Sequence, residues 1–76
     1  MPSFEEEISA VEQELLALRE DHARAQATVR SLMDSEDPVQ GIFFPQEIHL
    51  ARQEKVRLDF EIQFRTGKIN RLRSGG

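Results

Sequence analysis

The chain has 76 residues and no cysteine, which leaves room for one domain and excludes a disulfide framework or a thiolate metal site. Charged residues make up 32% of it and the formal net charge is −4, a balance that argues against nucleic acid as a main ligand. No apolar run approaches the roughly 18 residues of a membrane span, and the first residues lack a signal-peptide pattern, so we expect a cytoplasmic protein without a membrane partner.

A first helix is expected over residues 3–33. Ser3 followed by Glu6 is a capping box, in which the serine oxygen accepts a backbone N–H and the glutamate reaches back. A stripe with alternating steps of four and three then runs for four heptads without Gly or Pro: Phe4, Ile8, Val11, Leu15, Leu18, His22, Ala25, Val29 and Leu32. This spacing predicts a coiled-coil face.

A loop is expected over residues 34–44. Pro38 and Gly41 are turn residues, and a helix does not readily continue through the Asp37–Pro38 step. The loop combines an acidic tip with a short apolar run, and its candidate binding residues are Asp34, Glu36, Asp37, Ile42, Phe43 and Phe44.

A second helix is expected over residues 45–72, because Pro45 suits the first position of a helix. Its stripe is Ile48, Ala51, Lys55, Leu58, Ile62, Arg65 or Thr66, Ile69 and Leu72. Gly67 costs about 1 kcal/mol relative to alanine inside a helix, so the last turns are expected to fray or bend. Residues 74–76 are expected to be disordered.

The distribution of charge predicts that the two helices fold back on each other. Residues 1–40 hold ten acids and three bases, whereas residues 41–76 hold four acids and seven bases. An antiparallel arrangement brings the glutamates at 5–7 beside the basic end of the second helix, at Lys68, Arg71 and Arg73, and each cluster suits the dipole of its own helix. We therefore assign these bases to neutralising the acidic start of the chain, and not to RNA or DNA.

The expected fold is all-α, a single domain over residues 1–76 formed by an antiparallel two-helix coiled-coil hairpin. Pairing Val29 with Ile48 aligns small residues with small ones and places His22 opposite Lys55. This polar layer is interpreted as setting the register. A lone histidine beside a cation does not suit a metal ion, and no nucleophile–base pair or phosphate-binding loop is present. We expect no enzyme activity, no metal and no cofactor.

A second apolar stripe lies away from the predicted seam. Val56, Phe60 and Phe64 stand four residues apart on the second helix, and Leu16 belongs to a weaker counterpart on the first. A two-helix hairpin buries one face of each helix, so these side chains call for a further layer. We expect the hairpin to associate into a four-helix bundle, with itself or with a protein partner.

Two functions fit these surfaces. The first is a small adaptor, co-chaperone or assembly component that binds proteins through its helix faces. The alternative is a regulator that inserts its acidic tip into a larger machine such as RNA polymerase, since the hairpin resembles, in shape and charge, the coiled-coil hairpins that enter the secondary channel of that enzyme. The first function depends on the second stripe and the alternative on the acids of the tip.

Overall fold

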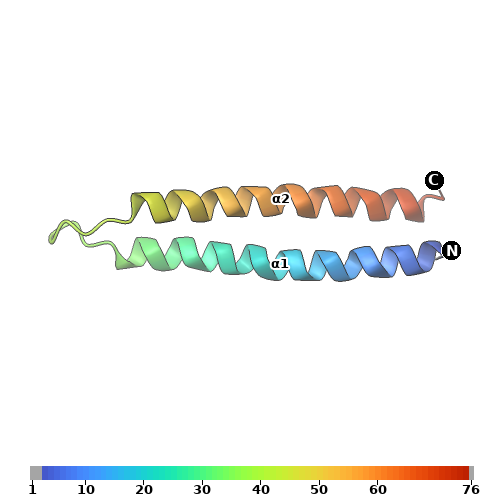
Figure 1. Ribbon diagram of the computed structural model, residues 1–76, viewed down its shortest axis with the longest axis horizontal. Coiled ribbons are helices and arrows are strands. Elements are labelled where there is room, and N and C mark those ends of the chain that lie inside the picture. Colours follow the sequence, from blue (N-terminus) through green and yellow to red (C-terminus); the bar gives the residue numbers. More distant parts are fainter. Residues whose placement is uncertain (1–2, 76) are drawn as a thin grey trace.

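The protein is described by a computed structural model that covers residues 3–75. Helix α1 (Phe4–Ser35) and helix α2 (Pro45–Arg73) are joined by a loop over residues 36–44. The helices run antiparallel and side by side, so the start of α1 and the end of α2 share one end of the molecule and the loop forms the other (Figure 1). The described chain measures 60 × 16 × 15 Å, a rod two helices wide. The predicted all-helical hairpin is confirmed.

Helix α1 begins as its sequence predicts and ends slightly later. Ser3 is the N-cap, and its Oγ accepts a hydrogen bond from the Glu6 backbone N–H at 3.2 Å. The helix continues to Ser35, two residues beyond the expected end, and the Ser35 hydroxyl donates to the Ser31 carbonyl at 2.8 Å. Glu36 then takes an extended backbone conformation as the C-cap, which leaves the Asp37–Pro38 step outside the helix.

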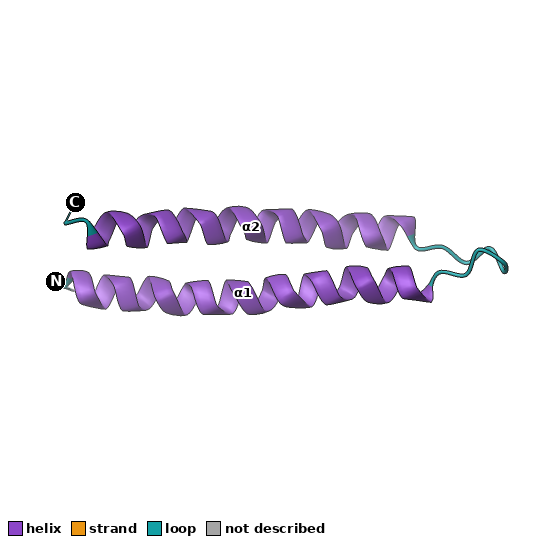
Figure 2. Ribbon diagram, turned by 180° about the vertical axis from the view of Figure 1, so that it is seen from behind, coloured by secondary structure: helices purple, strands orange, loops and turns teal. Residues whose placement is uncertain are grey.

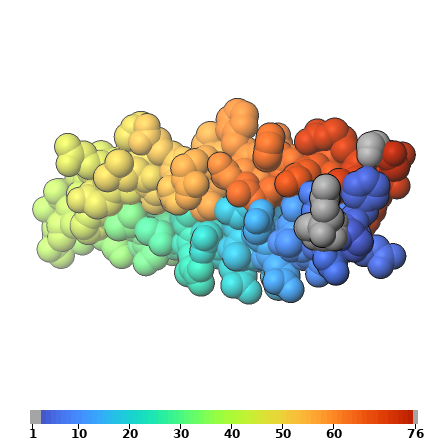
Figure 3. Space-filling model, turned by 45° about the vertical axis from the view of Figure 1, so that its right-hand side comes forward, coloured from blue at the N-terminus to red at the C-terminus, as the bar shows by residue number. Residues whose placement is uncertain are grey.

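The core is one thin seam between the two helices. Its buried side chains all belong to the two predicted stripes: Val11, Leu15, Ala25, Ile48, Leu58 and Ile69. Leu58 is the most enclosed of them, with 1% of its surface exposed. Because each helix buries only this stripe, most of the rod's side surface stays in contact with solvent (Figure 3).

The seam is best packed toward the open end of the hairpin. Val11, Leu15 and Ile69 form one buried cluster, and Ile8 and Ile62 pack against it. These five residues belong to neighbouring layers of the predicted register, so the pairing of the two stripes has the expected direction and approximate alignment.

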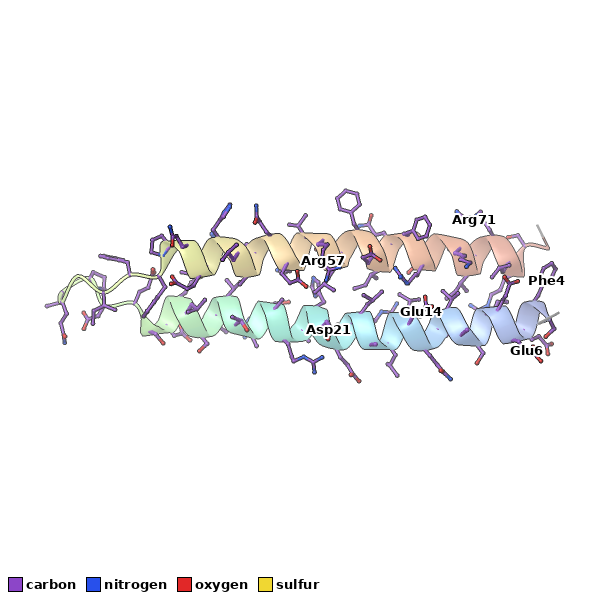
Figure 4. The ribbon with its side chains drawn as sticks, viewed as in Figure 1. Phe4, Glu6, Glu14, Asp21, Arg57 and Arg71 are labelled. Carbon is purple, nitrogen blue, oxygen red and sulfur yellow. The ribbon has the colours of Figure 1, made fainter. Side chains whose placement is uncertain are left out.

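The end of the apolar stripe departs from expectation at Phe4. This side chain begins the predicted seam, yet it is 53% exposed. Figure 4 places it at the open end of the rod, beside the last turn of α2. A terminal layer has neighbours on one side only, so a large ring there cannot be enclosed.

Ion pairs between the helices flank the seam. Arg65 Nε lies 2.9 Å from Glu14 Oε2, and the same guanidinium also pairs with Glu61 one turn earlier in α2. Figure 4 shows Glu14 directed from α1 toward α2. Arg73 pairs with Glu12 at 3.1 Å, so the basic end meets an acid one turn beyond the glutamates at 5–7. Hydrogen bonds from Arg65 to Glu61, and then to Glu14, raise the pKa of the guanidinium.

Neither α1 nor α2 is long and apolar enough to span a membrane, considering residues 3–75.

Candidate functional site

The polar layer in the seam contains a contact that the sequence did not predict. His22 is half-buried, and its Nε2 lies 2.9 Å from Asp59 Oδ1 on α2. Nε2 is closed off from solvent and forms no hydrogen bond with the described residues. Lys55 is also half-buried. Among residues 3–75 no cluster of three or more His, Cys, Asp or Glu side chains could hold a metal ion.

The loop folds into a narrow hairpin of its own, at the end of the rod (Figure 2). Asp37 and Ile42 exchange two backbone hydrogen bonds, each 2.8 Å long. Between them the Gly41 N–H donates to the Pro38 carbonyl at 3.3 Å, which closes a tight turn. Gly41 has a φ of 72°, a left-handed conformation that costs little without a Cβ.

Two of the three acids in the tip hold the loop together. Asp37 Oδ1 accepts hydrogen bonds from the N–H groups of Val39 (3.0 Å) and Gln40 (3.3 Å). Glu36 Oε2 accepts one from the Phe44 N–H at 3.0 Å, at the start of α2, where the helix dipole favours negative charge. The third acid, Asp34, is exposed on the last turn of α1. Two of the three carboxylates at the tip are therefore already hydrogen-bonded to backbone N–H groups of the loop.

Apolar side chains are also exposed at this tip. Phe44 is half-buried, whereas Phe43 and Ile42 are exposed. Val39, at the turn itself, is the most exposed large apolar residue of those that the structure describes, at 95%. Sequence reasoning overlooked Val39, because a single valine inside a turn belongs to no periodic pattern.

The second stripe of α2 lies on the outer face of the hairpin, away from the seam. Its residues have high exposed fractions: Val56 55%, Phe60 72% and Phe64 67%. Their spacing of four places them on successive turns along one side of the helix. Leu16 is exposed in the same way on α1, and Leu50, which the sequence reading did not single out, adds an exposed leucine to α2.

Basic side chains line hollows at both ends of this stripe. An open hollow of about 730 Å³ lies beyond Phe64, near the end of α2, and its lining is Phe64, Lys68, Asn70, Arg71, Leu72 and Ser74. A second hollow at the other end is lined by His49, Arg52, Gln53, Val56 and Arg57. Sequence reasoning had assigned Lys68 and Arg71 to the acidic start of α1. Figure 4 instead shows Arg71 on the side of α2 away from α1.

Some of these cations form ion pairs with acids of the same chain, and others do not. Arg57 Nη2 lies 2.6 Å from Glu54 Oε1, and the hydrogen bond from Arg57 lowers the pKa of that carboxyl. The same hydrogen bond raises the pKa of Arg57. Lys68 and Arg71, in contrast, form no ion pair within 4.0 Å with any acid of residues 3–75. The end of the stripe near Phe64 therefore carries two cations whose charge is not engaged in an ion pair among the described residues.

Comparison of the chain with protein-family models, with curated proteins and with solved structures found no match.

Proposed function

We propose that this protein is a non-catalytic, cytoplasmic protein–protein interaction module that binds through the outer face of α2. An adaptor, a co-chaperone or an assembly component would act in this way. The observation that carries the proposal is the exposure of Phe60 and Phe64, two large aromatic side chains one turn apart on a regular helix. Aromatic side chains are enriched at the centres of protein interfaces, where they contribute much of the binding energy.

Energetic considerations support a further helical layer on this face. Burying one phenylalanine stabilises by roughly 1.5–3 kcal/mol, so Phe60, Phe64 and Val56 together offer a large part of a binding free energy. The seam of the isolated hairpin has few buried side chains, which makes a chain of this size marginally stable alone. Two helices of a partner or of another copy would complete a four-helix assembly. The outer face of α2 and the apolar face of the added helices would then both be shielded from water.

The alternative is that the tip of the hairpin enters a larger machine such as RNA polymerase. The 60 Å length of the rod and the exposed Val39 at its end favour this function. The hydrogen bonds that engage Glu36 and Asp37 weigh against it, because these carboxylates would have to leave the loop backbone to reach a partner. We therefore place tip insertion second.

Sedimentation velocity and affinity capture test the proposal together. The face variant combines Phe60→Asp with Phe64→Asp, and the tip variant combines Asp34→Ala with Val39→Ser, which leaves the hydrogen bonds of the loop intact. Gln13→Asp adds a charge to the exposed side of α1 and serves as the control. We expect only the face variant to lose association or captured partners. If the face variant sediments as wild type and keeps every partner, the proposal fails.

A further inference from the structure

The outer face of α2 is basic as well as apolar. Lys68 and Arg71 stand at one end of the stripe, and His49, Arg52 and Arg57 surround the hollow at the other. All four acids of α2 lie toward its flanks or its inner side, since about 100° separates successive residues of a helix. Of these acids, Glu54 and Glu61 pair with arginines of the hairpin, and Asp59 lies against His22. A partner on this face therefore meets positive charge around an apolar centre.

We propose that the occupant of this face is an acidic amphipathic helix of another protein, with apolar residues facing the phenylalanines and carboxylates on both flanks. The inference rests on the proposed function and specifies its partner. A helix presents apolar residues three and four apart, which fits a ridge of side chains spaced by four. Carboxylates beside that ridge would reach Lys68 and Arg71, which form no ion pair within 4.0 Å among the described residues.

The same charges oppose a symmetric pair of α2 helices. In an antiparallel pair centred on Phe60, Phe64 meets Val56 of the other copy, but Lys68 then lies beside Arg52 at both ends of the pair. In a parallel pair each cation meets its own counterpart. Like charges brought together in an interface disfavour association. The outer face of a second α2 therefore does not suit this surface, whereas a helix that carries acids on its flanks does.

An anionic membrane surface fits this face less well than a helix does. The amide side chains of Gln53 and Gln63 lie among the exposed apolar residues of the outer side. A flat lipid surface would bury these polar positions, whereas a helix packed on the ridge leaves the positions beside it open to water. The chain as a whole is also negative, at −4.

A charge-exchange experiment with designed peptides tests this inference. The probes are two dye-labelled helical peptides of about 25 residues, or roughly 37 Å of helix. They share one leucine ridge and differ only in flanks of glutamate or lysine. Fluorescence anisotropy measures their binding to wild type, to the face variant Phe60→Asp with Phe64→Asp, and to the charge variant Lys68→Glu with Arg71→Glu. Arg19→Glu with Arg30→Glu on α1 makes the same charge change elsewhere, and circular dichroism checks that each variant is folded.

We expect wild type and the α1 control to prefer the glutamate-flanked peptide by about tenfold, and the charge variant to reverse that preference. The face variant should bind neither peptide. Equal binding of both peptides that is lost in the face variant would overturn the acidic partner but leave the proposed function intact. Failure of wild type to bind either peptide would overturn the inference.

Two further outcomes would also overturn it. One is self-association of wild type that disappears in the charge variant, which would make a second copy the occupant. The other is binding to phosphatidylserine-containing vesicles without any preference between the peptides.

Discussion

The division of α2 into an inner and an outer side can be tested with two leucines. Leu58 is 1% exposed in the seam, whereas Leu50 on the same helix is 63% exposed. Leu58→Ala removes a fully enclosed side chain and leaves a cavity, which costs about 2–5 kcal/mol. Leu50→Ala makes the same chemical change where little surface is buried, and we expect a loss of less than about 0.5 kcal/mol.

The loss at Leu58 is large relative to the whole protein. A core in a chain of this length rarely supplies more than about 3–5 kcal/mol, so Leu58→Ala should leave the hairpin largely unfolded at room temperature. Urea titration followed by circular dichroism at the helical band measures both variants. Equal losses for the two substitutions, or a small loss at Leu58, would refute the assignment of the seam.

Three further predictions concern stability, each measured as a thermal or urea midpoint. Glu36→Ala should cost about 1 kcal/mol, because the Phe44 N–H loses its carboxylate partner; an unchanged midpoint would contradict that role. Lys55→Leu should add about 1 kcal/mol by replacing a half-buried charge with an apolar side chain, and a loss would mean that Lys55 makes a specific paired contact. Gly67→Ala should also add about 1 kcal/mol, since the new Cβ would lie an ordinary 3.5 Å from the nearest Arg71 nitrogen; destabilisation would indicate a clash there.

The two helices and their seam could be predicted from sequence because they depend on local and periodic signals. The Ser3 cap and the steps of four and three are readable along the chain. All buried side chains fall on these steps, from Val11 to Ile69. Phe4, at the open end, is more exposed than its place in the stripe predicts. The spacing of apolar residues does not show that a terminal layer has neighbours on one side only.

The details of the loop and the ion pairs could not be predicted in the same way. Whether the Glu36 carboxylate faces solvent or caps α2 depends on how the chain turns at Gly41, and sequence spacing does not determine that path. The contact of His22 with Asp59 likewise depends on the relative rotation of the helices. Lys68 and Arg71 stand four and seven residues after Phe64, a spacing that already places them on its side of the helix, but the charge distribution along the chain assigned them to the acidic start of α1.

The most direct test of the central claim is photo-crosslinking from the outer face of α2. Phe60 is replaced by p-benzoylphenylalanine, a close analogue that reacts with whatever lies within a few ångströms. The same group is placed at Val39 in the tip and at Gln13 on α1. In an extract of the cells that make the protein, we predict a discrete crosslinked product from position 60 and none from the other two positions. A product from position 39 alone, or none from position 60, would contradict the assignment of this face as the binding surface.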